Sequence, residues 1–225
     1  MKIRKLYWNN RNELVMGIDG DFLELSALID GIQSMYESVN ARWSLVCNER
    51  MNLKKLLVKD ITVGDAAFRM ILEYGRFLNS TLPPYLIKLS RMCACVTARV
   101  KTQNSIEYKL QAYCGEKHAM GNIPVNKCMN DLFGIRVILD RNVPFYSIML
   151  FLNDAYGFRY RCTDASKDEY RAVHLYFRDG SFSFPWELQI WNPSDKHSNI
   201  DSHRKYKQGY TSWEQERMKG GILDV

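Results

Sequence analysis

Phosphate-binding residue types are concentrated in residues 99–109, where three cations and a hydroxyl occupy eleven positions: Arg99, Lys101, Ser105 and Lys109. Residues 95–101 alternate apolar and polar side chains, and this two-residue period predicts a strand with Arg99 and Lys101 on one face. Asn104 or Ser105 can then cap a helix that runs through Lys109. A hydroxyl, an ammonium and helix amide groups would converge there on one anion, so the segment predicts a polyphosphate site. A solvated strand edge is the alternative interpretation of so short a motif.

Two carboxylates accompany further predicted strands. Asp131 precedes a run of branched residues that is typical of a buried strand. Residues 184–191 alternate again and place Glu187, Gln189 and Trp191 on one face, opposite three apolar side chains. Magnesium takes hard oxygen ligands while arginine and lysine hold phosphate oxygens, so two carboxylates beside several cations suit metal-assisted phosphoryl transfer. Taken alone, Asp131 is most simply a turn or cap residue.

Five short motifs follow one another in an order that is typical of one enzyme family. The first reads R-x-K-x-x-x-S-I-x-x-K and the second D-x-x-G-x-R, and together the five occupy residues 99–109, 131–136, 169–174, 187–192 and 202–207. In these motifs the chain resembles the synthetase domain of RelA/SpoT homologues, of the small single-domain type. The resemblance implies an α+β fold, with a mixed β-sheet flanked by helices as in nucleotidyltransferases. It also implies a pyrophosphokinase, which transfers the β,γ-pyrophosphate of ATP to a ribose hydroxyl of an acceptor.

The resemblance also implies roles for single residues. The residues that would hold the ATP phosphates and base are Arg99, Lys101, Ser105, Lys109 and Arg136. Asp131 and Glu187 match the catalytic carboxylates that hold Mg²⁺, and Glu187 can also help to deprotonate the acceptor hydroxyl. The residues assigned to the acceptor side are Tyr170, Arg171, His174, Gln189, Asn192 and His203, of which Tyr170 would stack on the acceptor base. His174, between two apolar neighbours, is alternatively a structural histidine.

Two departures from the family pattern bear on the acceptor. The motif around Tyr170, residues 167–172, lacks the usual glycine, proline and serine, and Glu169 places a carboxylate beside the stacking ring. Trp191 stands where the family has an arginine that pairs with phosphate. Both changes weaken the case for GDP or GTP as acceptor, because negative charge repels a polyphosphate, although Lys167 and Arg171 can offset it. They favour an acceptor with a stacked terminal base and few phosphates close by, such as the 3′ end of an RNA.

Composition sets wider limits. The chain has 225 residues, with 31 Lys plus Arg against 25 Asp plus Glu, so its formal charge of +6 makes an anionic partner plausible without requiring one. Its six cysteines form no C-x-x-C pair and no hydrophobic leader opens the sequence, so we expect a reduced, cytoplasmic protein. Apolar runs are too short for a membrane span, so no membrane partner is expected.

The elements that must position these residues can be placed along the chain. Apolar residues at gaps of three or four predict a helix over residues 21–51, and a second helix is expected at about 65–78, ended by Pro83 and Pro84. A short final helix is expected over residues 209–219. The expected division is an N-terminal helical region at 1–78, a pyrophosphokinase domain at 79–210 and a C-terminal tail at 211–225.

Three functions remain open. The first is a toxin that pyrophosphorylates the 3′-CCA end of tRNA, stops translation and is neutralised by an antitoxin protein. Its candidate RNA-binding residues are the basic side chains Lys2, Arg4, Lys5, Lys54, Lys55, Arg204, Lys205 and Lys207, each alternatively part of a solvated face. The second is synthesis of alarmone nucleotides from ATP and GDP, GTP or adenine nucleotides. The third is a non-catalytic RNA-binding module, which has no need for both Asp131 and Glu187. In each enzymatic case the resemblance implies synthesis without hydrolysis.

Overall fold

A five-stranded mixed β-sheet forms the centre of the molecule. The computed structural model describes residues 12–93, 95–157 and 159–205. The strands are β1 (Val96–Val100), β2 (Phe133–Ile138), β3 (Arg161–Asp164), β4 (Val173–Phe177) and β5 (Trp186–Trp191), and their order in the sheet is β1-β2-β5-β4-β3. β2 and β5 run parallel, while the other neighbouring pairs are antiparallel. The sheet and its helices confirm the predicted α+β class.

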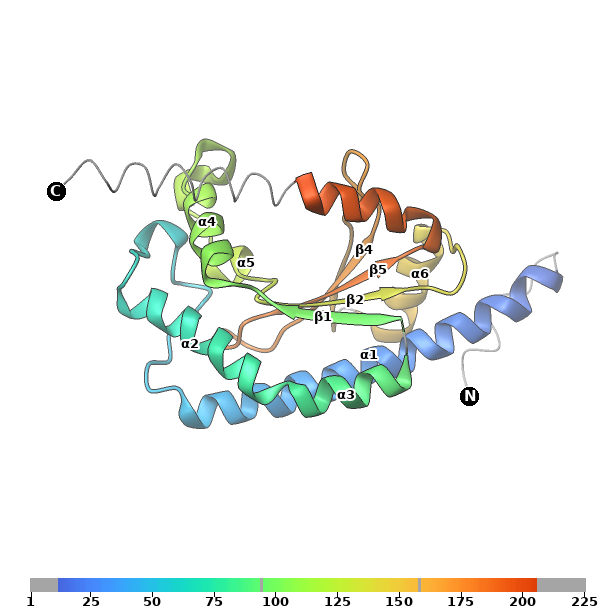
Figure 1. Cartoon of the computed structure of the whole chain (residues 1–225), viewed down its shortest axis with the longest axis horizontal. Coiled ribbons are helices and arrows are strands. Elements are labelled where there is room, and N and C mark those ends of the chain that lie inside the picture. Colours follow the sequence, from blue (N-terminus) through green and yellow to red (C-terminus); the bar gives the residue numbers. More distant parts are fainter. Residues whose placement is uncertain (1–11, 94, 158, 206–225) are drawn as a thin grey trace.

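Helices lie on both sides of this sheet. They are α1 (Asn12–Val46), α2 (Ala66–Thr81), α3 (Pro83–Met92), α4 (Gln103–Tyr113), α5 (Val125–Cys128) and α6 (Phe145–Tyr156), with short 3₁₀ turns η2 (Val58–Asp60), η3 (Glu116–Gly121) and η4 (Pro193–Asp195). A further helix occupies residues 196–205. Figure 1 shows α1, α2 and α3 along one side of the sheet, while α4 and the helix at 196–205 lie on the opposite side. No helix among the described residues is long and apolar enough to cross a membrane.

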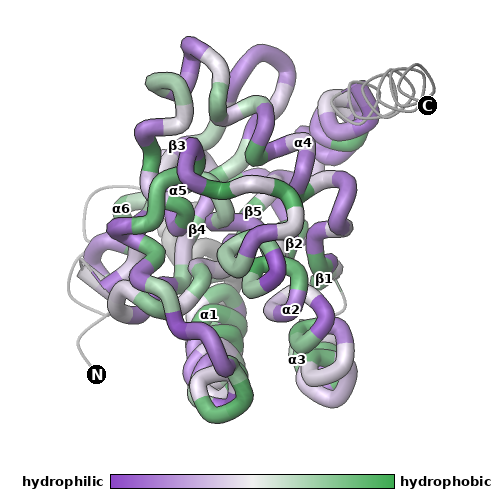
Figure 2. The backbone as a smooth tube through the Cα atoms, turned by 90° about the vertical axis from the view of Figure 1, so that its left-hand side faces the viewer, coloured by the Kyte–Doolittle hydropathy of each residue, from purple (hydrophilic) through white to green (hydrophobic). Residues whose placement is uncertain are grey.

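The long helix α1 supplies much of the core. Its predicted apolar stripe is buried from Phe22 to Trp43, so the three- to four-residue spacing located the packed face correctly. The helix ends at Val46 rather than at residue 51, and Val46, the last residue of the predicted stripe, is 57% exposed. In Figure 2, α1 and α3 form a layer beneath the strands.

A buried hydrogen-bond chain joins this helical layer to the sheet. Trp186 Nε1 of β5 donates to the Tyr74 hydroxyl at 2.8 Å, and Tyr74 donates to Asn40 Oδ1 at 3.1 Å. Asn40 in turn donates to the backbone oxygen of Tyr36 at 2.9 Å. Because the Trp186 N–H, the Tyr74 hydroxyl and the Asn40 amide all have partners in this hydrogen-bond series, these aromatic residues can pack in the core without the cost of an unpaired donor.

The segment around the two prolines differs from the sequence prediction. Asp65 caps α2 by accepting a hydrogen bond from the Phe68 amide, but the helix continues to Thr81, beyond the predicted end at residue 78. Pro83 and Pro84 then begin α3 instead of a loop. Proline is favoured in the first turn of a helix because its fixed φ is already helical and its missing N–H is not needed there. The helix expected at 209–219 lies outside the described residues.

Candidate active site

The polar face of the sheet carries two rows of side chains that cross four strands. Strand register places Arg99, Gly134, Glu187 and Tyr176 in one row, and Thr97, Arg136, Gln189 and His174 in the next. Side chains two residues apart point to the same face, so both rows lie on the side of the sheet opposite α1. This confirms the predicted faces of residues 95–101 and 184–191. Positions as far apart in the sequence as Thr97 and Gln189 thus meet on one surface.

A cavity of about 330 Å³ opens over these rows. Its lining residues are Thr97, Ala98, Arg99, Asp131, Gly134, Ile135, Arg136, Glu187 and Gln189. Gly134 lies between Arg99 and Glu187 in the register, and a Cβ built on it would meet no atom within 4 Å. The missing side chain therefore leaves open the floor of the cavity, between a cation and a carboxylate. Four predicted ATP or metal residues and the acceptor-side residue Gln189 share this cavity.

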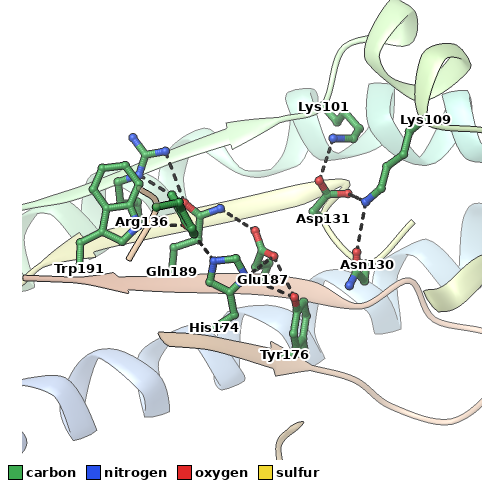
Figure 3. Close-up of polar contacts among 11 residues, drawn as sticks. Lys101, Lys109, Asn130, Asp131, Arg136, His174, Tyr176, Glu187, Gln189 and Trp191 are labelled. Atoms are coloured by element: carbon green, nitrogen blue, oxygen red, sulfur yellow. Dashed lines mark hydrogen bonds and ion pairs between the residues drawn. The ribbon is translucent and has the colours of Figure 1, made fainter. Parts of the chain in front are cut away.

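Asp131 is held between two lysines at one end of the cavity. Lys101 Nζ lies 2.7 Å from Asp131 Oδ2, and Lys109 Nζ lies 2.9 Å from Asp131 Oδ1 (Figure 3). The three side chains are only 7%, 12% and 18% exposed, respectively for Lys101, Lys109 and Asp131. Burial alone would raise the pKa of the Asp131 carboxyl, but the charges and hydrogen bonds of Lys109 and Lys101 outweigh it and hold that pKa well below its usual range.

The two lysines differ in their electrostatic balance. Burial lowers the pKa of Lys101, and the attraction of Asp131 only partly offsets this effect. Burial acts in the same direction on Lys109, but there Asp131 dominates and the pKa is raised. Lys109 also contacts Asn130 Oδ1 at 3.4 Å, an amide that the sequence analysis did not single out. Lys109 is therefore firmly a cation, while Lys101 is the ammonium that burial destabilises.

The cap of α4 is Thr102, one turn from Ser105, and not Asn104 or Ser105 as predicted. The Thr102 side chain accepts a hydrogen bond from the Ser105 amide, and its hydroxyl lies 2.9 Å from the Ser105 hydroxyl. All three residue types are good caps, so sequence could not choose between them. The helix starts earlier than expected, which places Ser105 inside its first turn and leaves Lys109 one turn further along, directed at Asp131.

Glu187 is the second carboxylate, and hydrogen bonds hold both of its oxygens. Oε1 accepts from the Tyr176 hydroxyl at 3.1 Å and lies 3.0 Å from His174 Nδ1, while Oε2 accepts from Gln189 Nε2 at 2.7 Å (Figure 3). Burial would raise the pKa of the Glu187 carboxyl, but the hydrogen bonds from His174 and Gln189 lower it overall. Glu187 is accordingly a carboxylate at neutral pH.

The carboxylates fit a magnesium site. Mg²⁺ is commonly held by one or two carboxylates together with substrate phosphates, and Asp131 and Glu187 both line the cavity. Among the described residues, no group of three or more His, Cys, Asp and Glu side chains could bind a metal by itself. An incoming polyphosphate would therefore have to complete the coordination. The ion would neutralise phosphate charge there, and Lys101 and Lys109 would have to share Asp131 with it.

The acceptor-side residues form an aromatic cluster instead of an open platform. Tyr170 is half-buried and meets Trp191, His174 and His203 edge-on, with ring centroids 6.0, 5.8 and 5.4 Å away. Burial raises the pKa of the Tyr170 phenol above its usual range. His203 stacks on Trp191 at 5.6 Å, and burial with the charges of Arg136 and Arg99 lowers its pKa to about 4. His203 is therefore neutral at physiological pH.

Two predicted acceptor residues have structural contacts in place of cavity contacts. The Asn192 amide accepts from the Val143 backbone N–H at 2.9 Å and donates to the Val143 carbonyl at 3.1 Å, and Asn192 is 8% exposed. It thus joins the end of β5 to the segment before α6, and it does not line the cavity. Arg171 is exposed and donates to the backbone oxygens of Asp168 and Tyr170, so it closes the loop before β4.

The predicted RNA-binding residues are dispersed. Lys54 and Lys55 are exposed in the turn after α1, where the Asn52 side chain accepts from both backbone amides. Arg204 pairs with Asp201 at 3.1 Å and Lys205 with Glu169 at 3.2 Å, both at the surface. Such exposed pairs contribute little to stability. The remaining candidates, Lys2, Arg4, Lys5 and Lys207, lie outside the described residues.

Sequence reasoning missed three site residues. Tyr176 reaches Glu187, Gly134 opens the cavity floor, and Asn130 contacts Lys109. The alternation of β4 could have identified Tyr176, because it lies two residues after His174 and so shares its face. Nothing local marks Asn130, whose contact depends on how α4 packs.

Comparison with known proteins identifies the family. The family described as the region found in RelA / SpoT proteins matches residues 98–211, just over half of the chain. The chain belongs to the RelA/SpoT family. This membership makes it a diphosphotransferase, a pyrophosphokinase of the RelA/SpoT synthetase type, and the matched region contains both carboxylates and all residues of the two polar rows except Thr97. No curated protein matches the chain significantly.

Solved structures similar to this RelA/SpoT-family chain include two alarmone synthetases that the alignments cover almost completely and a third protein that is covered less fully. Small alarmone synthetase 1 from Bacillus subtilis aligns with 18% identity and a TM-score of 0.38, covering 68% of this chain and 99% of that one. Small alarmone synthetase 2 from the same organism aligns with 17% identity and a TM-score of 0.38, covering 72% and 100%. The smu.1046c protein from Streptococcus mutans UA159 gives 17% and 0.35, covering 65% and 77%. At such TM-scores the alignments carry no argument about this site.

Proposed function

We propose that this RelA/SpoT-family chain transfers the β,γ-pyrophosphate of ATP to the 3′-terminal ribose of tRNA, with Mg²⁺ as cofactor. One observation supports the transfer chemistry above others: Arg99, Arg136, Asp131 and Glu187 line the same cavity. Cations and two metal-binding carboxylates around one space are what the triphosphate of an ATP–magnesium complex requires. Arg99, Lys101, Ser105, Lys109 and Arg136 are the proposed ATP-binding residues.

The proposed reaction is one displacement at phosphorus. The acceptor hydroxyl oxygen forms a bond to the β-phosphorus of ATP, the bond from that phosphorus to the α,β-bridging oxygen breaks, and AMP leaves. The hydroxyl proton passes to Glu187, which is ionised and lines the cavity. Bound magnesium would supply charge neutralisation on the transferred phosphates. Lys101, Lys109 and Arg99 would hold the phosphate oxygens in line with the attacking group.

The acceptor preference is supported by the charge around Tyr170. Three cations near this ring already have partners: Arg171 bonds backbone oxygens, Lys205 pairs with Glu169, and Arg136 lies over Trp191. A GDP or GTP acceptor brings its own 5′-polyphosphate and needs cations there. The terminal adenosine of tRNA brings a stackable base with its phosphates further along the strand. His203 and Gln189 would border that base, and a neutral His203 adds no charge.

A second candidate is the synthesis of alarmone nucleotides from ATP and GDP, GTP or adenine nucleotides. The ATP half of the site, with Asp131 between two lysines, suits this reaction equally well. It requires no RNA-binding surface, which agrees with the dispersed and surface-paired basic residues. Incubation of the protein with Mg²⁺ and γ-labelled ATP, with deacylated tRNA, GDP, GTP or AMP in separate reactions, distinguishes the two.

For the tRNA reaction we expect label in tRNA that disappears when the 3′-terminal adenosine is removed. Glu187→Gln, which keeps the size of the side chain, should abolish transfer and serves as the control for contaminating kinases. Label in a free nucleotide alone would replace the tRNA proposal by alarmone synthesis. Reversal of Lys54 and Lys55 to Glu should weaken tRNA modification if that turn docks RNA, and transfer to tRNA at the wild-type rate would remove it from the docking surface.

The biological part of the proposal is a toxin neutralised by an antitoxin protein. Modified tRNA 3′ ends cannot be aminoacylated, so expression of the wild-type chain should arrest growth. Expression of Glu187→Gln at the same level should not. Growth arrest by both would show that the arrest does not depend on transfer, as expected if it came from RNA binding alone.

A further inference from the structure

Trp191 occupies the centre of the site although it lies outside the cavity lining. It is the last residue of β5 and is fully buried. The Arg136 guanidinium carbon lies 3.7 Å from the centre of its ring, and His203 is stacked on it with an interplanar angle of 20°. Its Nε1 also donates a hydrogen bond to the Tyr170 hydroxyl at 3.2 Å. One side chain therefore contacts both the ATP-side residue Arg136 and the acceptor-side residue Tyr170.

The contact with Arg136 fixes the plane of the guanidinium. A cation lying over an indole face is attracted by the ring quadrupole, and tryptophan is the best of the aromatic residues for this contact. Arg136 also points its Nε and one terminal nitrogen at Gln189 Oε1, both at 3.4 Å, in the row next to Glu187. With one face covered by Trp191, Arg136 still lines the cavity. The ring thus holds a long, flexible side chain in one orientation towards the nucleotide.

The contact with Tyr170 fixes the direction of a hydrogen-bond chain. The indole N–H can only donate, so the Tyr170 oxygen accepts from it and its own proton is directed to His174 Nε2, 2.8 Å away. His174 then presents Nδ1–H to Glu187 Oε1 at 3.0 Å, and that carboxylate can only accept. The Trp191 N–H can only donate and the Glu187 carboxylate can only accept. With these two groups at the ends of the chain, Tyr170 and His174 each accept one hydrogen bond and donate the next.

We propose that Trp191 is a positioning residue that couples the two halves of the site, its ring face orienting Arg136 towards the donor nucleotide and its Nε1–H orienting Tyr170 and, through His174, Glu187. The inference rests on the proposed transfer reaction but not on which acceptor is used. The two contacts use different parts of the indole, so substitutions can remove them one at a time.

Three variants separate the contacts. Trp191→Phe keeps an aromatic face for Arg136 but removes the N–H. Tyr170→Phe keeps both rings but removes the hydroxyl that accepts from Trp191 and donates to His174. Trp191→Leu removes the ring face and the N–H together. Tyr146→Phe, at a tyrosine of α6 that is 74% exposed, is the matched control for loss of a phenol hydroxyl.

Binding of α,β-methylene ATP with Mg²⁺ tests the ring face. Trp191→Phe should bind within about twofold of wild type, whereas Trp191→Leu should bind about tenfold more weakly, because the cation–π contact is lost. The kinetic constants kcat and KM should also separate the role of the N–H from the role of the ring face. In Trp191→Phe and in Tyr170→Phe, kcat should fall about fivefold while KM for ATP stays unchanged, the effect of one lost hydrogen bond. The double variant should show the same fivefold loss, because both changes interrupt one chain.

The hydrogen bond of the Trp191 indole N–H can be tested by NMR, without an activity assay. The chain has five tryptophans, and Trp191→Phe identifies the Trp191 indole cross-peak in a ¹H–¹⁵N spectrum. Tyr170→Phe should shift that cross-peak and speed its exchange with solvent, while Tyr146→Phe should leave it in place. An unmoved Trp191 cross-peak in Tyr170→Phe, a multiplicative loss in the double variant, or wild-type nucleotide binding by Trp191→Leu would each overturn the inference. A shifted cross-peak and intact nucleotide binding without transfer to any acceptor would instead overturn the proposed function.

Discussion

At the scale of single residues, Asp131 performs two roles that compete. The same carboxylate that would bind Mg²⁺ neutralises Lys101 and Lys109, the lysines proposed to hold phosphate. Polyphosphate and metal relieve this competition when they arrive together, since phosphates attract the lysines while the ion takes the carboxylate. Each should therefore promote binding of the other, and by linkage the promotion must be reciprocal.

Asp131→Asn tests this competition. Without the carboxylate charge the lysines are free for phosphate, so metal-free ATP should bind about tenfold more tightly than to wild type, although transfer is lost. Titration calorimetry with and without Mg²⁺ measures both effects, and Mg²⁺ should enhance ATP binding in wild type only. The variant should lose about 1–3 kcal/mol of unfolding free energy, because two largely buried ammonium groups lose their counter-charge. Weaker metal-free binding in Asp131→Asn would show that Asp131 does not restrain the lysines.

At the scale of elements, β2 owes its function to a residue with no side chain. Gly134 lies in a row with Arg99 and Glu187, and the space above it is part of the cavity. Glycine in a strand interior lowers stability. At position 134 this loss accompanies an open cavity floor, which a larger side chain would fill.

Gly134→Val should separate stability from activity. A Cβ at this position meets no atom within 4 Å, and valine is favoured in strands. The free energy of unfolding should therefore stay equal or rise by up to about 1 kcal/mol, measured by urea unfolding. The branched side chain would fill the cavity floor and abolish nucleotide binding, measured with α,β-methylene ATP. Gly75→Ala in α2 is the control, because its added methyl makes only an ordinary contact with Val100 at 3.9 Å. It should stabilise the helix by about 1 kcal/mol and keep binding. Normal binding by Gly134→Val would place the nucleotide elsewhere.

The sequence predicted features that depend on neighbouring residues better than features that depend on contacts between distant segments. The sequence predicted correctly which side chains of β1 and β5 share a face, because the two-residue period depends only on residues that are neighbours in the sequence. The cap of α4 was wrong because Thr102 and the two predicted residues offer equivalent oxygens, and only the folded backbone chooses one. Tyr170 was predicted to stack on the acceptor base, whereas the structure half-buries its ring against neighbouring aromatic side chains. Its contacts with Trp191 and His203 come from segments that tertiary packing alone brings together.

At the scale of the whole molecule, acidification should lower folding stability through two titratable residues of the site, His203 and Asp131. The folded protein lowers the pKa of His203 to about 4 from its usual 6.5, so between these values the unfolded chain binds a proton that the folded chain excludes. Stability should therefore fall as pH decreases from about 6.5 to 4. Asp131 adds a loss at lower pH, because its folded pKa is also depressed and its stabilisation disappears once it is protonated.

Urea unfolding at a series of pH values measures this dependence. His203→Gln should flatten the decline between pH 6.5 and 4 relative to wild type, since glutamine does not titrate. His197→Gln, at an exposed position on the same helix, is the control and should reproduce the wild-type slope. Parallel curves for wild type and His203→Gln would mean that His203 takes up its proton equally in the folded and unfolded chain.

The strict alternation of β5 has a consequence for how this gene can change. Glu187, Gln189 and Trp191 lie on the polar face of the sheet, while Trp186, Leu188 and Ile190 face the core. Loss of one codon within the strand would exchange these two sets, sending a carboxylate and an amide into the apolar layer and a row of hydrocarbon side chains onto the polar surface. Point substitutions in β5 can alter activity or packing separately, but a single-residue deletion must destroy both at once. Length changes compatible with survival of the protein are therefore to be sought in its connecting loops.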